Sequence, residues 1–294
     1  MTRHLPTSSS RASLWSRRDF LATAATLPWS LRGSMVSAAT AIPVGLEMYS
    51  VRDALAKDPG ATVRAVAEMG YQGLEFYAPY FEWSVSQARD MRKLLDDLGI
   101  RCLSTHNGSE FFSGDKLQHA RELNLILGSN YLVMASSHEK SGLDGWHKVA
   151  ETLNAAEEKL RPDGLNVGYH NHQPEFALTE GVRPMEIIAR NTKSSVMLQL
   201  DVGTCIEAGS DPVAWIKANP GRIRSMHCKD YSHDPAKKYS VLFGEGDADW
   251  KSLFHAAENG GGIEYYLVEQ EGSCFPELET AKKCLQAFRE AHGA

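Results

Sequence analysis

One unit of sequence recurs eight times from Val44 onward, and this repetition constrains the fold more than any other feature of the chain. Each unit begins with a short apolar run, passes through a polar or glycine-containing turn, and continues as a longer amphipathic segment. The apolar runs predict strands at residues 44–49, 72–76, 100–105, 130–134, 165–170, 195–201, 223–229 and 263–269. The amphipathic segments predict helices near residues 60–69, 84–98, 115–127, 145–160, 183–191, 211–218, 249–258 and 276–291. Because strands and helices alternate strictly, the sequence predicts a parallel sheet.

Local patterns support both kinds of element. Strand runs such as 196–200 and 265–268 are short and do not alternate strictly, which is typical of strands buried on both faces. In 84–98, apolar side chains recur on one helical face, and Arg and Asp lie opposite them. Four helices are expected to end at glycines, which are Gly70, Gly99, Gly128 and Gly260.

Eight such units without a sign of a second domain predict a single (β/α)8 TIM barrel, which we assign to residues 40–294. The rival is an open, doubly wound sheet. That fold would show a phosphate-binding glycine turn after its first strand, whereas residues 48–53 contain no glycine cluster. The closed barrel is therefore the preferred prediction.

The first 39 residues differ from the rest and are predicted to be a signal peptide. They are rich in Ser, Ala, Thr and Arg, and residues 16–21 resemble the twin-arginine export signal. An apolar stretch follows at 20–31, and small residues at 36–39 offer a cleavage site. We therefore expect export to the periplasm through the twin-arginine (Tat) translocase. A disordered basic tail is the alternative, and a membrane span is disfavoured because the apolar run is shorter than ~20 residues.

Composition limits the classes of partner and of crosslink. The formal net charge is −6, which disfavours nucleic acid as a partner. The chain contains five cysteines with no C-x-x-C pair, so we expect buried thiols rather than a disulfide framework. One incidental disulfide in an oxidising compartment is the alternative. A homo-oligomer is compatible with the sequence, since barrels of this kind often pair.

Ionisable and polar side chains are predicted at nearly every strand end, where the active sites of (β/α)8 enzymes lie. These residues are Glu47, Tyr49, Glu75, His106, His170, Asn171, His172, Asp201, His227, Lys229 and Glu269. A single buried His or Glu is most often a satisfied structural residue. A whole ring of them is costly unless its members are paired or ligated, which predicts a functional site.

The last four strands carry a predicted metal site made of His170, Asp201, His227 and Glu269. Two imidazoles and two carboxylates suit one divalent ion, namely Mn²⁺, Co²⁺, Fe²⁺, Zn²⁺ or Mg²⁺. His172 and Glu175 are alternatives to His170, and we prefer His170 because it ends its strand. If His170 is the ligand, His172 and Glu175 would bind substrate or carry protons.

Several stretches, in this order, resemble the sugar phosphate isomerase/epimerase superfamily of xylose isomerase-like barrels. They are residues 45–53, 70–75, 169–176, 200–203, 227–230, 244–247 and 268–269, which together span about residues 44–270. The resemblance implies a metal-dependent enzyme acting on a sugar, with a ligand set of Glu, Asp, His and Glu from strands five to eight. Asp201, His227 and Glu269 match that set, whereas His170 stands where many members have Glu.

His170 places the chain nearer a subgroup with a His-Asn-His fifth strand, which includes exported proteins. That subgroup resembles keto-inositol dehydratases and enzymes that eliminate across 3-keto-glycosides. The ketose 3-epimerases, which exchange the proton between two glutamates, fit less well. The superfamily also contains three-zinc apurinic endonucleases, but these need further histidines, and Glu75 stands where one would be expected.

All of the implied sugar reactions begin with removal of a proton alpha to a carbonyl, and a bound metal ion would stabilise the resulting enediolate. We expect an isomerase or epimerase, with a β-eliminating lyase or hydratase as the first alternative and a non-catalytic exported sugar-binding barrel as the second. The expected acid–base residues are His106, His172, Glu175, Lys229 and Glu269, with Lys229 acting as an acid only if burial lowers its pKa. A Lys229–Asp230 salt bridge is the structural alternative. Expected substrate contacts are Glu47, Tyr49, Arg52, Glu75 and Glu245.

Overall fold

The computed structural model describes residues 42–137 and 142–293 together with Met1. Apart from Met1, the predicted signal peptide lies outside these ranges, so export stays a prediction. The fold below is that of the chain from residue 42 onward.

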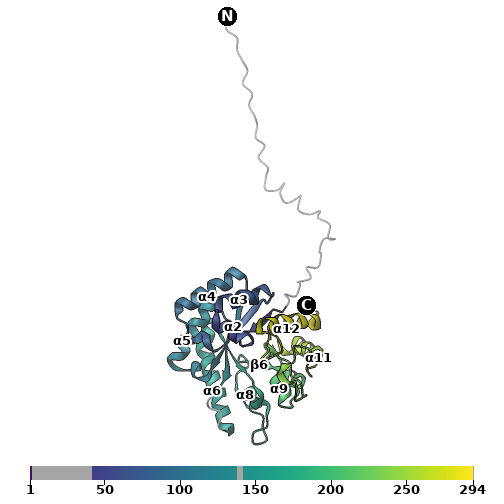
Figure 1. Ribbon diagram of the computed structural model, residues 1–294. Helices are drawn as coiled ribbons and strands as arrows, with labels where there is room; N and C mark the ends of the chain where they lie inside the picture. Colours follow the sequence, from purple (N-terminus) through teal and green to yellow (C-terminus); the bar gives the residue numbers. More distant parts are fainter. Residues whose placement is uncertain (2–41, 138–141, 294) are drawn as a thin grey trace. The chain divides into compact units, whose positions relative to one another are not determined.

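The described chain forms a closed barrel of eight parallel strands, with each strand paired to its neighbours in chain order. The strands are β1 (Val44–Glu47), β2 (Gly73–Phe76), β3 (Arg101–Gly108), β4 (Tyr131–Ser136), β5 (Asn166–His170), β6 (Met197–Asp201), β7 (Ser225–Cys228) and β8 (Tyr265–Val268). Figure 1 shows the strands at the centre, with helices around them. The prediction of a (β/α)8 barrel is confirmed.

Helices follow the strands and cover the outside of the barrel. The longer ones are α3 (Pro59–Glu68), α4 (Val85–Leu98), α5 (Gly114–Leu127), α6 (Gly142–Leu160), α8 (Pro184–Asn191), α10 (Pro212–Ala218), α11 (Trp250–Ala256) and α12 (Glu277–His292). Each predicted helix corresponds to one of these. Three short helices at the strand ends were not predicted, namely α2 (Arg52–Lys57), α7 (Gln173–Phe176) and α9 (Val202–Glu207).

Glycine ends the helices as expected in three of the four predicted places. Gly70, Gly99 and Gly128 all adopt a left-handed φ, which a side chain rarely tolerates. After α11, however, the helix widens into a π turn, η7 (Ala257–Gly261), and Gly262 rather than Gly260 has the left-handed φ of +84°.

Large apolar side chains fill the lower part of the barrel interior. Leu103, Tyr131, Val133, Met197, Tyr265 and Leu267 form one buried cluster there. Three inward positions are glycine because a neighbour occupies the space: a Cβ at Gly45 or Gly73 would collide with Leu103, and one at Gly168 would collide with Met197. The interior is thus a packed core up to the layer where the polar residues begin.

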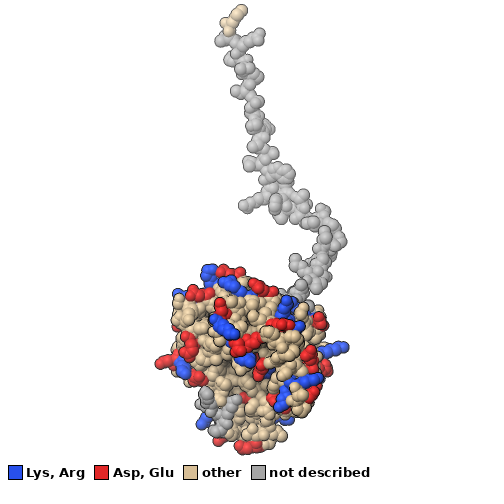
Figure 2. All heavy atoms as spheres, viewed as in Figure 1, with Lys and Arg blue, Asp and Glu red and all other residues tan. Residues whose placement is uncertain are grey.

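The outer surface carries both signs of charge. In the view of Figure 2, Lys and Arg side chains are interspersed with Asp and Glu. None of the helices in the described ranges combines the length and apolar character that a membrane crossing requires. All five cysteines are described and are free thiols, four of them buried and Cys274 exposed.

Candidate active site at the C-terminal end of the barrel

Parallel register brings the predicted polar residues to one level. Glu47 pairs with Glu75 across β1 and β2, and Asp201 pairs with His227 across β6 and β7. His170, at the end of β5, lies beside Gln199 of β6. Inward positions on a strand recur every two residues, so these side chains form a polar layer directly above the apolar cluster.

His227 bridges two carboxylates in the middle of this layer. Its Nδ1 lies 2.6 Å from Glu269 Oε2, and its Nε2 lies 2.8 Å from Glu75 Oε1. Burial lowers the pKa of His227, but hydrogen bonds with Glu269 and Glu75 outweigh burial and raise it to about 10. In this arrangement His227 is an imidazolium that ties β2, β7 and β8 together.

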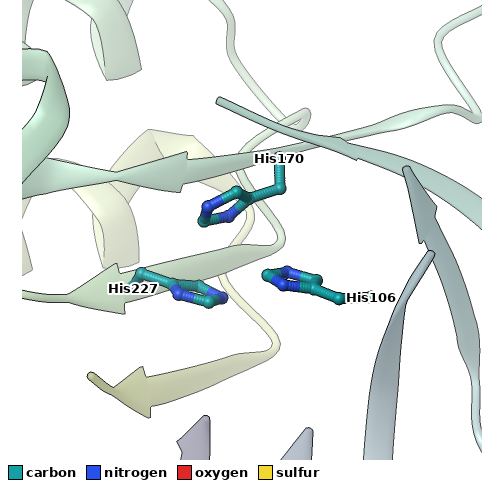
Figure 3. Close-up of side chains that lie close together, drawn as sticks. All are labelled: His106, His170 and His227. Atoms are coloured by element: carbon teal, nitrogen blue, oxygen red, sulfur yellow. The ribbon is translucent and has the colours of Figure 1, made fainter. Parts of the chain in front are cut away.

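Three imidazoles lie close together at the centre of the polar layer, from β3, β5 and β7 (Figure 3). The rings of His106 and His227 are stacked with centroids 5.1 Å apart, and His170 lies 4.4 Å from His227. Burial lowers the pKa of His170, and the nearby charges of His227 and His106 lower it further. His170 is therefore neutral at pH 7 and can offer a lone pair.

Asp201 presents one carboxylate oxygen to the site. Its Oδ1 accepts a hydrogen bond from Thr204 N at 3.0 Å and so caps α9. Its Oδ2 is buried and lies 3.9 Å from His170 Nε2. Asn171 holds the two strands in register, since its Oδ1 accepts from Asp201 N at 2.9 Å and its Nδ2 donates to Thr204 Oγ1 at 3.0 Å. The central Asn of the His-Asn-His triplet thus connects β5 to β6.

Lys229 lies among carboxylates rather than beside Asp230. Its Nζ is 2.8 Å from Asp201 Oδ2, 3.3 Å from Glu269 Oε1 and 2.7 Å from Glu271 Oε1. Burial alone would lower the pKa of Lys229, but these three carboxylates raise it well above its ordinary value. The condition under which Lys229 was expected to act as an acid, a pKa lowered by burial, is therefore not met. The structural alternative, a Lys229–Asp230 salt bridge, is also wrong, because Lys229 pairs with Asp201, Glu269 and Glu271 instead.

Asp230 has a different role, since it accepts hydrogen bonds from one loop. The donors are the backbone N–H groups of Tyr231, Gly244, Gly246 and Ala248 and the indole of Trp250. A Cβ at Gly246 would collide with Asp230. The Gly244–Asp247 motif therefore wraps a loop around a buried carboxylate.

Glu47 contributes a buried carboxyl group to the wall of the site. Its Oε1 accepts from Tyr49 N at 3.3 Å, while Oε2 has no hydrogen-bond partner among the described residues. Burial raises the pKa of Glu47 well above its ordinary value, and the charges of Glu75 and Glu269 raise it further. Glu47 is thus the carboxyl group of this layer most prone to hold a proton.

A cavity of about 410 Å³ opens above the polar layer. Glu47, His106, His170, His172 and Glu269 contribute polar side chains to its lining. The other lining residues are Tyr49, Tyr77, Ala78, Phe81, Asn107, Gly108, Glu110, Ala135, Ser136 and Glu271. The volume falls in the usual range for small-molecule sites.

Seven predicted site residues are not among those that line this cavity: Asp201, His227 and Lys229, described above, and Glu175, Arg52, Glu245 and Glu75. Glu175 is buried, accepts a hydrogen bond from Tyr169 OH at 2.9 Å and caps His172 N at 3.0 Å. Arg52 donates to the carbonyls of Tyr49 and Glu271, so it supports two lining residues from behind. Glu245 is exposed and accepts from Leu242 N. Glu75 lies beneath the floor, bonded to His106 and His227.

Gln199 is a central residue that the sequence analysis missed. It lies two positions before Asp201 on the same face of β6 and contacts side chains from β2, β3, β5 and β7. The strand period of two, which places Gln199 on the same face as Asp201, is the signal that could have identified it. Glu271, which contacts Lys229, was also missed because it follows the strand end in a loop.

Candidate metal ligands gather in this layer. The ligand atoms of His170, Asp201 and Glu269 all lie within 4.8 Å of one another, and all three residues are buried. Two further groups are His106, His170 and His227, and Glu47, Glu75, His106 and His227. The structure thus brings three of the four predicted ligands together, while the fourth, His227, is bonded to Glu269.

The chain is similar to sugar-related enzymes. It is 25% identical over 169 residues to the inosose dehydratase of Geobacillus thermodenitrificans, which covers 50% of this chain and 55% of that protein. The chain thus spans about half the length of the curated relatives it matches. A crystal structure of a sugar phosphate isomerase/epimerase from Parabacteroides distasonis is 28% identical with a TM-score of 0.71, covering 86% of this chain and 96% of that one.

A more distant structure, the IOLI protein with a bound zinc atom, is 16% identical with a TM-score of 0.65, covering 85% of this chain and 97% of that one. At this identity the likeness shows the fold alone. The family model of the xylose isomerase-like TIM barrel matches residues 63–291, which is most of the chain. The chain therefore belongs to the xylose isomerase-like TIM barrel family.

Proposed function

We propose that this protein is a metal-dependent enzyme that removes a proton alpha to the carbonyl of an uncharged keto-sugar or keto-cyclitol and then eliminates water. The observation that carries the proposal is the buried group of His170, Asp201 and Glu269, of which His170 and Glu269 line a cavity at the C-terminal end of the barrel. Catalytic groups occupy this end in (β/α)8 enzymes.

The donor set fits one divalent cation. His170 Nε2 and Asp201 Oδ2 are 3.9 Å apart, which is too far for a hydrogen bond but within the span of two ~2.1 Å bonds to one ion. Glu269 supplies a second carboxylate. In this structure the Lys229 ammonium neutralises Asp201 Oδ2 and Glu269 Oε1, the oxygens that would face the ion. A cation held there would polarise the substrate carbonyl and stabilise the negative charge that develops on its oxygen.

The cavity wall offers a base and an acid. His106 Nε2 lies between two acceptor oxygens, those of Gln199 and Glu75, so this nitrogen is a donor and cannot take a proton. His172 lines the cavity beside His170, and we assign it as the base that removes the proton from the alpha carbon. Glu47 lines the cavity with an unpartnered carboxyl oxygen, and we assign it as the acid.

Elimination then balances as follows. His172 takes the alpha proton, the carbon–hydrogen electron pair forms the new double bond to the beta carbon, and the beta hydroxyl leaves with the Glu47 proton as water. The enzyme resets when His172 returns its proton to solvent and Glu47 takes one up. Support for elimination over epimerisation comes from His170, which stands where a two-carboxylate epimerase would need a second carboxylate. The inosose dehydratases among the relatives support the same outcome.

An uncharged substrate is favoured by the charges around the cavity. Glu47, Glu110, Glu269 and Glu271 line it, and no Lys or Arg does so within the described ranges. A phosphate ester would therefore find no cationic side chain to pair with among these lining residues. Tyr77 and Phe81 form an apolar side suited to the face of a sugar ring, whereas Tyr80, Phe111 and Phe112 are buried in the core.

An isotope-exchange assay tests the proposal. We expect protein supplied with Mn²⁺, Co²⁺ or Zn²⁺ to exchange the alpha hydrogen of a keto-inositol or 3-keto-glucoside for deuterium in D2O, and to form a product 18 Da lighter, as followed by NMR and mass spectrometry. The variants Asp201→Ala and His170→Ala should lose bound metal and at least about 100-fold in rate, because each removes a proposed ligand.

Asp115→Ala is the matched control, because Asp115 is an exposed carboxylate on α5. It should retain both metal and rate. Stoichiometric metal in both ligand variants would contradict the site. Exchange without loss of water would replace elimination by epimerisation or isomerisation. Sugar binding that survives a chelator, with no exchange on any substrate, would favour the non-catalytic alternative.

A further inference from the structure

Gln199 connects four strands through its side-chain amide. Its Oε1 lies 2.7 Å from His106 Nε2 and 3.1 Å from His170 Nδ1. Its Nε2 donates to Glu75 Oε2 at 2.9 Å and to Ser225 Oγ at 3.2 Å. The whole residue is buried, and so are its partners Glu75, His170 and Ser225, while the His106 side chain is 12% exposed.

The two ends of the amide are not interchangeable. Glu75 Oε1 already faces the ring nitrogens of His106 and His227, and Glu75 Oε2 faces the Gln199 amide, so this carboxylate acts only as an acceptor. An amide oxygen turned toward Glu75 would place two acceptors in contact without a hydrogen between them. The Nε2 of Gln199 must therefore point to Glu75, and its Oε1 must point to the two histidines.

An amide oxygen can only accept, so both facing ring nitrogens must carry hydrogen. His106 Nε2 meets this condition twice, because Glu75 Oε1 also lies 2.9 Å from it. For His170 the hydrogen is on Nδ1, which in a neutral ring leaves the lone pair on Nε2. That nitrogen is the one that faces Asp201 Oδ2.

We propose that Gln199 is a positioning residue: it holds His170 as the Nδ1–H tautomer and thereby aims the Nε2 lone pair at the oxygen of Asp201. The tautomer assignment stands on the hydrogen bonds of Gln199 alone. Its consequence, that His170 is preset as a cation ligand, rests on the proposed function. The hydrogen bond made by the second ring nitrogen of a ligating histidine commonly sets its orientation and tautomer.

NMR of uniformly 15N-labelled protein tests the tautomer directly. Long-range proton–nitrogen correlations distinguish a protonated ring nitrogen from a bare one, and we expect His170 to carry hydrogen on Nδ1 in the metal-free wild-type chain. Free imidazole side chains favour hydrogen on Nε2, so this pattern departs from the default. In Gln199→Met, which has similar length but no amide, His170 should shift toward the Nε2–H form.

Metal affinity supplies the second readout. Titration of the metal-free proteins with Zn²⁺ should show Gln199→Met binding about 10- to 100-fold more weakly than wild type. Ser225→Ala is the matched control, because it removes a contact at the other end of the amide and touches neither imidazole. It should keep both the tautomer and the affinity.

The outcomes separate the two proposals. Hydrogen on Nε2 of His170 in the wild-type chain would overturn the role of Gln199, even if Gln199→Met fails to fold. The expected tautomer in a protein that binds no divalent metal would leave Gln199 as assigned and remove the proposed function. A lost tautomer with unchanged Zn²⁺ affinity would exclude His170 as a ligand.

Discussion

Lys229 places a fixed positive charge among three carboxylates at the top of the barrel. It is 1% exposed, and the carboxylates of Asp201, Glu269 and Glu271 surround its ammonium group. Charges buried this deeply are tolerated only when they are paired. Lys229 therefore stabilises the very oxygens that we propose as metal ligands, and a bound cation would compete with it for them.

Replacing Lys229 with methionine tests this competition. The metal-free variant should be destabilised by about 3 kcal/mol, because Asp201 and Glu269 lose their buried partner. Addition of Mn²⁺ or Zn²⁺ should then raise the melting temperature of Lys229→Met more than that of wild type, as measured by calorimetry. An equal or smaller metal-induced shift in the variant would show that Lys229 does not compete for the ligands.

The site residues that could be predicted from the sequence are those that end a strand with a side chain of obvious chemistry. Asp201 and His170 stand out because an ionisable group interrupts an apolar run. Gln199 is neutral and lies within such a run. Its only signal in the sequence is that it stands two positions before Asp201, and therefore on the same face of the strand. Glu245 was predicted to contact substrate because of its motif, but its carboxylate accepts a hydrogen bond within its own loop.

At the scale of elements, the loop after β7 depends on Asp230. Four backbone N–H groups and the Trp250 indole converge on this buried carboxylate, so the loop is folded around a charge rather than around apolar side chains. Hydrogen bonds to a charged group contribute more than neutral ones. The same loop leads into α11, so an ordered loop also helps to fix the position of that helix in the outer layer of the barrel.

Asp230→Asn should destabilise the protein by about 2–4 kcal/mol, because an amide offers fewer acceptor sites and turns an N–H group toward existing donors. Hydrogen exchange at Gly244, Gly246 and Ala248 should accelerate before the barrel strands are affected. Asp115→Asn on α5 serves as the surface control. Unchanged protection at these three amides would contradict the role given to Asp230.

Every strand and every longer helix was predictable, because each apolar run and each 3.6-residue stripe is long enough to recognise. The helices α2, α7 and α9 were not, because four to six residues contain less than two turns of pattern. Of these short helices, α9 follows β6 directly, α7 begins three residues after the end of β5, and a 3-10 turn at Met48–Val51 separates α2 from β1. The polar residues near these strand ends were interpreted as site residues, so the starts of the short helices were not recognised.

At the scale of the whole molecule, the reactivity of the cysteine thiols is a measure of how tightly the barrel is packed. Cys102, Cys205, Cys228 and Cys284 are buried in the described fold, and Cys274 is exposed. Burial raises the pKa of the Cys102 thiol to about 12 and that of Cys284 to about 11. Since the thiolate is the reactive form, these groups should be inert in the native state.

A thiol reagent such as Ellman's should therefore label one cysteine rapidly in the native protein at pH 8 and the other four only after unfolding by guanidinium. Cys274→Ser should abolish the fast phase without changing the melting temperature. A second fast thiol would show that part of the barrel opens readily. Fewer than five reactive thiols after unfolding without reductant would indicate a disulfide.

The glycines at positions 45, 73 and 168 affect how the proposed acid and base can exchange protons with solvent. By leaving space for Leu103 and Met197, they allow apolar side chains to pack the barrel interior beneath the polar layer. A substrate bound in the cavity would lie against His172 and Glu47, which both line it, and would separate them from bulk water. Under the proposed function, a proton removed during turnover would stay inside until the product departs, which makes product release the step that renews the acid and the base.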